Sequence, residues 1–81
     1  MIRKLVKAAE VEVGERAYHV RYYEHKTIRG LSRFSSEVLL GPGDRIILDD
    51  DSISSLESRV ERLVPATVYS RLLAGRPPVA A

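Results

Sequence analysis

The stretch from Gly41 to Gly75, GPGDRIILDDDSISSLESRVERLVPATVYSRLLAG, decides the fold of this chain. It opens with the turn sequence Gly41-Pro42-Gly43-Asp44 and continues with a short apolar strand pattern from Arg45 to Leu48. An acidic segment, Asp49 to Asp51, then leads into a long helical pattern that Gly75 ends. The stretch therefore predicts the last strand of a sheet followed directly by a C-terminal helix.

The first half of the predicted helix has one apolar side. At about 100° per residue, the apolar residues from Ile53 to Val64 fall on one stripe, and serine, glutamate and arginine fall opposite. Ser52 is in the position of an N-cap, because its hydroxyl can accept a hydrogen bond from an amide of the first turn. The preceding aspartates then lie near the positive end of the helix dipole. We expect this half to pack on the sheet.

Pro65 interrupts the pattern. A proline inside a helix removes a backbone hydrogen bond and clashes with the preceding turn, at a cost of about 3 kcal/mol. Beyond it the apolar residues fall on a different side, and Arg71 takes the direction that Ile53 held. Either the chain bends at Pro65 and a second helix returns to the same core, or the helix stays nearly straight and its far end packs on another molecule. We predict a helix kinked or split at Pro65, with the straight alternative kept open.

The N-terminal part of the chain predicts a hairpin. Gly14-Glu15 has the form of a two-residue turn, with glycine at the position where a type II′ turn needs a positive φ. This turn gathers apolar groups on one face and complementary charges on the other. The predicted pairs are Val13–Arg16, Val11–Tyr18, Ala9–Val20 and Lys7–Tyr22 on the first face, and Glu12–Ala17, Glu10–His19 and Ala8–Arg21 on the second.

Two further strands complete the expected sheet. The third runs from Leu31 to Leu40, and the fourth contains Ile46-Ile47-Leu48, whose three apolar residues predict partial cover on both faces. In the third strand we expect Phe34, Val38 and Leu40 to point inward, and Arg33, Ser35 and Glu37 outward. The fold class is therefore α+β: a four-stranded antiparallel meander with the C-terminal helix packed on one face. We expect one domain over residues 1–75 and a disordered tail over 76–81.

Composition sets limits on function. The chain has 81 residues, no cysteine and a formal net charge of +2, so it can form no disulfide and has no thiolate chemistry. Residues 1–36 carry eight basic and four acidic groups, whereas residues 37–61 carry two basic and seven acidic. Such a charge dipole suits contacts between copies at least as well as contacts with nucleic acid. An apolar run of about 18 residues and a signal peptide are both missing, so we expect a cytoplasmic protein without a membrane partner.

No pattern in the sequence supports catalysis or metal binding. The carboxylates of Asp49, Asp50 and Asp51 sit at a strand-to-helix joint, where cap and loop roles explain them and the spacing of a calcium loop is missing. His19 pairs with Glu10 across the predicted hairpin, which is an ordinary surface pair. The serines around Ser52 lie in no nucleophile-elbow pattern. We therefore expect a protein that is not an enzyme and needs no cofactor or metal.

The segment from residue 21 to residue 34 interleaves cations with aromatic rings. Arg21, Lys26, Arg29 and Arg33 are the cations, and binders of single-stranded nucleic acid combine such residues with rings for base stacking. Several glutamates on the same expected surface dilute its positive charge. An RNA- or DNA-binding module that uses these four residues is the alternative function.

The acidic turn and Ser-capped helix start, from Asp49 to Leu56, resemble the corresponding part of HicB-type antitoxin domains. The glycine-rich central strand of that family is missing here, so the sequence assigns no family. The first hypothesis for function rests on the apolar residues beyond the proline instead. It is a self-associating structural or regulatory module whose homodimer or partner contact is made by Val68, Tyr69, Leu72 and Leu73.

Overall fold

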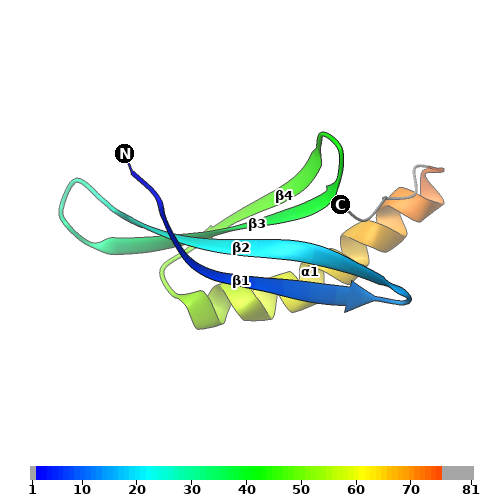
Figure 1. Cartoon of the computed structure of the whole chain (residues 1–81), viewed down its shortest axis with the longest axis horizontal. Helices are drawn as coiled ribbons and strands as arrows, with labels where there is room; N and C mark the ends of the chain where they lie inside the picture. Colours follow the sequence, from blue (N-terminus) through cyan, green and yellow to red (C-terminus); the bar gives the residue numbers. More distant parts are fainter. Residues whose placement is uncertain (1, 76–81) are drawn as a thin grey trace.

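The computed structural model describes residues 2–75, and the predicted tail lies outside the described residues. Four strands form one antiparallel sheet in the order β1-β2-β3-β4, and one helix follows them, as predicted (Figure 1). The elements are β1 (Lys4–Val13), β2 (Arg16–Lys26), β3 (Ser32–Gly41), β4 (Asp44–Asp50) and α1 (Ile53–Leu73).

The register of the first hairpin is the predicted one. Every expected pair between β1 and β2 is present, from Val13 opposite Arg16 to Lys7 opposite Tyr22. Gly14 has a φ of 62° in the turn, the conformation for which glycine was expected there. The pairing is irregular only between Leu5 and Lys7, near the start of β1.

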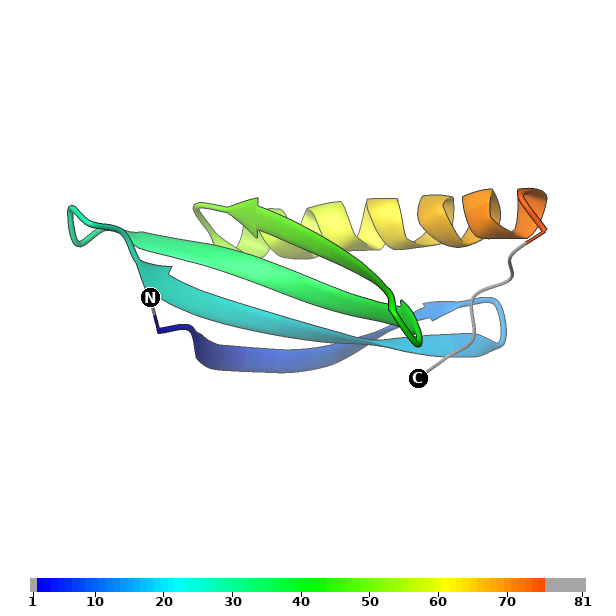
Figure 2. The same ribbon diagram turned by 90° about the horizontal axis from the view of Figure 1, so that it is seen from above.

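The core lies between the inner face of the sheet and α1. The helix covers this face of the sheet and not the other (Figure 2). Its buried apolar residues are Tyr18, Val20, Tyr22, Val38 and Leu40 from the sheet, and Leu56, Val60, Val64 and Val68 from the helix. Phe34 packs against this cluster, as expected.

One expectation for the outer face is wrong. Ile47 lies there at 59% exposure, so β4 is covered on one face only. Ser35 is on the outer face, as expected, but it is buried, because its small side chain is flanked by those of its cross-strand neighbours Tyr23 and Asp49.

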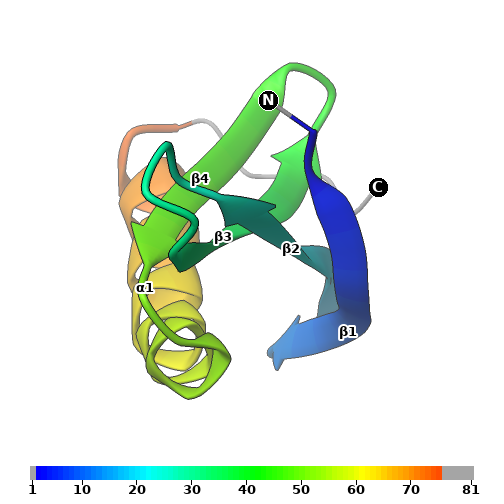
Figure 3. The ribbon, with the colours of Figure 1, turned by 90° about the vertical axis from the view of Figure 1, so that its left-hand side faces the viewer.

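The helix is not split at Pro65, because α1 continues through this residue to Leu73, and it runs nearly straight, which is the alternative that was kept open (Figure 2). The buried residues of the helix follow one another at intervals of four, and Val64 and Val68 extend the series across the proline. A row with this spacing turns by about 40° per step around the helix. Sheet strands rotate relative to one another in the same progressive way, which Figure 3 shows from β1 to β4. A straight helix therefore stays in contact with a twisted sheet although its apolar side changes direction.

Within the described residues, three ion pairs attach the helix to the sheet: Arg71–Asp44, Lys7–Glu57 and Arg59–Asp50. Arg71 donates from Nε and Nη2 to the two carboxylate oxygens of Asp44, at 3.0 and 2.9 Å. The hydrogen bonds from Arg71 hold the pKa of Asp44 below its ordinary value. Nearer the start of the helix, Lys7 of β1 pairs with Glu57. Arg71 can face the sheet although it is charged, because it pairs there with the Asp44 carboxylate of β4.

The start of α1 is capped as predicted, with an additional set of contacts. The Ser52 hydroxyl accepts from the Ser55 amide at 3.2 Å. The Asp50 carboxylate accepts from the Ser55 hydroxyl at 2.7 Å, from the Asp51 amide at 2.7 Å and from Arg59 at 3.2 Å. The Ser55 hydroxyl and the Asp51 amide hold the pKa of Asp50 far below its ordinary value of 3.8. Asp50 is therefore a cap for the joint and not a free acidic group.

This cap predicts a pH dependence. The pKa of Asp50 is lower in the folded state than in the unfolded state. The ionised Asp50 carboxylate therefore stabilises the fold fully when the pH is above its unfolded-state pKa, and this stabilisation is lost as the pH falls towards its folded-state pKa. Asp50→Asn should lower the urea midpoint at pH 7, and its difference from the wild type should shrink as the pH falls to about 2. Glu12→Gln, on the exposed outer face, is the control and should leave the dependence of the urea midpoint on pH unchanged. A difference that stays constant with pH would contradict this role.

Candidate self-association surface

The helix end presents three exposed apolar side chains. Tyr69, Leu72 and Leu73 are 62%, 49% and 90% exposed. Val68, which sequence analysis placed in the same contact, is buried in the core of its own chain. Three of the four predicted contact residues are therefore exposed at the surface, and the fourth, Val68, is buried beside them.

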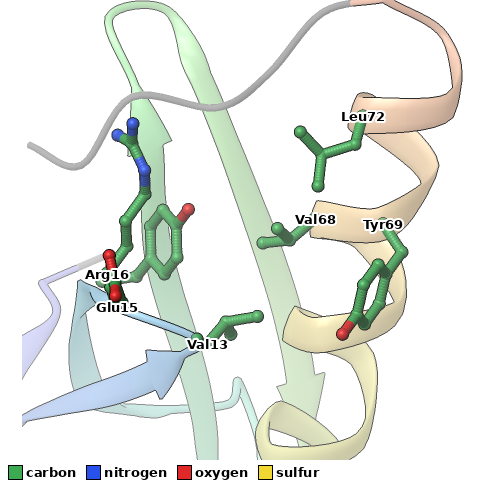
Figure 4. A pocket seen from close by; sticks show the side chains of 8 residues that line it. Val13, Glu15, Arg16, Val68, Tyr69 and Leu72 are labelled. Atoms are coloured by element: carbon green, nitrogen blue, oxygen red, sulfur yellow. The ribbon is translucent and has the colours of Figure 1, made fainter.

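A groove of about 320 Å³ lies beside this helix end, between α1 and the β1–β2 turn. Val13 and Tyr18 line it from the hairpin, and Val68, Tyr69 and Leu72 from the helix. Figure 4 shows Val68 and Leu72 pointing from α1 towards the hairpin, with Val13 on the opposite wall. The groove is therefore mostly apolar and combines residues from distant parts of the chain.

One polar atom of the groove has no partner. Tyr18 is fully buried, and within the described residues its hydroxyl makes no hydrogen bond. Buried polar groups are nearly always hydrogen-bonded, and a buried hydroxyl without a partner costs about 1–3 kcal/mol. The hairpin register predicts Tyr18 on the inner face, where it lies, but strand pairing carries no information on the hydrogen bonds of its hydroxyl.

The turn at the rim of the groove carries adjacent opposite charges. Glu15 and Arg16 both line the groove and are exposed. Neither forms an ion pair in the part of the chain that the structure describes. A neighbouring pair of opposite charges is complementary to a second copy of itself when the two copies are related by a two-fold axis.

The predicted nucleic-acid residues do not form one free cationic surface. Arg33 pairs with Asp49, whose hydrogen bond raises the pKa of Arg33. Lys26 donates to the Ser32 hydroxyl at 2.7 Å and lies 3.9 Å from the Glu24 carboxylate. Arg21 lies opposite Glu37 in the sheet, and Arg29 lies in the β2–β3 loop.

The aromatic rings of this segment are similarly engaged. Tyr22 is buried, which raises the pKa of its hydroxyl. Arg3 lies over the ring of Tyr23, at 4.3 Å from its centre. Base stacking needs free ring faces, so this arrangement offers little for it.

The remaining titratable groups are spread over the surface. His19 Nδ1 lies 3.7 Å from the Glu10 carboxylate, as the predicted register requires. Over residues 2–75, histidine, aspartate and glutamate nowhere gather in a group of three that could hold a metal ion. In the same residues, no helix is long and apolar enough to span a bilayer.

Comparisons with protein families, curated proteins and solved structures find no match to this chain.

Proposed function

We propose that this chain is a self-associating interaction module, and that two copies join through the helix end and the groove beside it. The observation that carries the proposal is that the exposed Tyr69 and Leu72 line an open apolar groove, with the exposed Leu73 next to them in the chain. Each copy thus offers both apolar side chains and a place to bury them. In an isologous contact, the helix end of each copy would insert into the groove of the other copy. Such a contact buries the exposed side chains and fills both grooves.

The polar groups of the groove favour a second copy as the occupant. Paired across a two-fold axis, Glu15 of one copy can meet Arg16 of the other, so the charges at the rim complement themselves. Tyr18 lines the groove, and a polar group of the second copy that reached its buried hydroxyl would supply the missing hydrogen bond. The chain is small, and a domain of this size buries only about 60% of its unfolded surface, so association would add core that one copy lacks.

The proposal describes a structural or regulatory role and assigns the chain no catalytic step. It takes the chain to act in the cytoplasm. The four cations of the basic segment take no part in it.

The first test removes the side chain most exposed at the helix end. Leu73→Asp should weaken association at least tenfold, because a charge would replace an aliphatic group in a dry contact. Sedimentation velocity over a range of concentrations measures this. Ile28→Asp is the matched control, since Ile28 is equally exposed but lies in the β2–β3 loop, and it should leave association unchanged. A wild-type chain that shows the mass of one copy at every concentration would end the proposal.

The second test separates packing from hydrogen bonding in the groove. Tyr18→Phe removes only a hydroxyl that has no partner in the single chain, so the stability of the single chain should stay the same or rise. Association should weaken by about 0.5–1.5 kcal/mol if the other copy bonds this hydroxyl. Urea unfolding at low concentration and sedimentation equilibrium measure the two effects. Unchanged association would show that the hydroxyl is not part of the contact.

A further inference from the structure

The β2–β3 loop, residues 27–31, is a small closed structure at the opposite end of the molecule from the groove (Figure 2). The Thr27 amide donates to the Leu31 carbonyl at 2.8 Å, and the Gly30 amide donates to the Thr27 carbonyl at 2.9 Å. The Leu31 amide donates to the Thr27 hydroxyl at 3.1 Å. Gly30 has a φ of 78°, which an L residue rarely adopts. The backbone of the loop is thus closed by three hydrogen bonds, which hold it in one shape.

The side chains that this loop holds out are aliphatic. Ile28 is fully exposed and Leu31 is 65% exposed, so neither serves the core of its own chain. Ile2, at 91% exposure, adds a third aliphatic group from the chain that precedes β1. Isolated exposed apolar residues are ordinary, but a group of them on one rigid tip indicates a binding surface.

A hollow of about 470 Å³ lies beside the tip. It is lined by Thr27, Ile28, Arg29 and Leu31 of the loop and by His25 at the end of β2. The His25 Nδ1 atom is buried and, among the described residues, has no hydrogen-bond partner. The accessible walls of the hollow are therefore mostly aliphatic and include one cation.

Cations surround the aliphatic tip. Lys26 and Arg29 flank Ile28 in the chain, and the β1–β2 register places Lys4 opposite Glu24, so the start of β1 lies beside the base of the loop. Figures 1 and 2 both show the beginning of the chain at the same end as this loop. Arg3 adds a further positive charge there.

The acidic groups at this end are largely engaged. Glu24 accepts a hydrogen bond from the Ser32 hydroxyl at 2.8 Å and lies 3.9 Å from the Lys26 ammonium, so the charges of Glu24 and Lys26 offset each other. Asp49 pairs with Arg33, and Asp50 pairs with Arg59. Asp51 is exposed and forms no ion pair in the described residues, so the excess of positive charge near the tip comes from Arg3, Lys4 and Arg29.

We propose that this tip is a contact site for the surface of an anionic lipid bilayer. Ile28 and Leu31 enter the boundary between headgroups and acyl chains, and Arg29, Arg3 and Lys4 lie against the phosphates. A surface contact of this kind needs no spanning helix. The site is distinct from the groove and does not depend on self-association.

The chemistry of the tip favours lipid over nucleic acid. A binder of single strands uses rings for stacking, whereas the described residues of the tip present aliphatic groups and no free ring. Aliphatic side chains surrounded by cations match the two layers of a bilayer surface, which is apolar below and anionic above.

The test measures co-sedimentation of the full chain with vesicles. Vesicles of phosphatidylcholine with about one third phosphatidylglycerol should retain the chain, and vesicles of phosphatidylcholine alone should not. Ile28→Ser with Leu31→Ser should reduce partitioning at least tenfold, and Arg29→Ala should reduce it about fivefold. All three residues are exposed, so the urea midpoints should stay close to the wild type.

Matched controls and competing outcomes complete the test. Ile47→Ser and Arg62→Ala change exposed residues of the same types elsewhere, on β4 and α1, and should leave partitioning unchanged. Equal retention by both kinds of vesicle, retention by neither, or equal loss in the controls would overturn the proposal. Binding to single-stranded RNA that needs Arg29 but not Ile28 and Leu31, without retention by anionic vesicles, would overturn it in favour of the nucleic-acid alternative.

Discussion

The burial of one helical row on a twisted sheet is the constraint on which this structure depends. Leu56, Val60, Val64 and Val68 recur at intervals of four, and all four are buried against the inner face. Each fully buried aliphatic side chain contributes about 1.5–3 kcal/mol, so the row outweighs the cost of about 3 kcal/mol for Pro65 inside the helix. The proline is therefore tolerated because residues on both sides of it are held by the same surface.

The same constraint decides which side chains remain for partners. Once the row and the Arg71–Asp44 pair fix the sheet-facing side of α1, Tyr69 and Leu73 must face away from the core. The first hairpin stops short of covering the helix end, which leaves the groove between them. At the other end the β2–β3 loop closes on itself and leaves Ile28 exposed. The two proposed contact sites are thus made of apolar side chains that the core does not bury, one site at each end of the molecule.

Most of the fold could be predicted from the sequence, because local patterns and the core require the same arrangement. The turn at Gly14 and the alternation around it fixed the register of β1 and β2, since a shift by one residue would have put Tyr18 outside. The helix beyond Pro65 was predicted wrongly because a helical wheel assumes a flat partner, and the twist of the sheet is a property of all four strands. The groove, the unpartnered Tyr18 hydroxyl and the Lys7–Glu57 pair join residues far apart in the chain, and single-sequence periodicity carries no information on such contacts.

The central claim is that α1 is held as one unit across Pro65, and amide hydrogen exchange tests it most directly. The amides of Val68 and Tyr69 should be protected to the same degree as those of Val60 and Val64, and all four should exchange through global unfolding. They should also respond to urea with the same slope. If the amides after Pro65 exchange orders of magnitude faster than those before it, the far half of the helix is not held by the sheet, and the account is wrong.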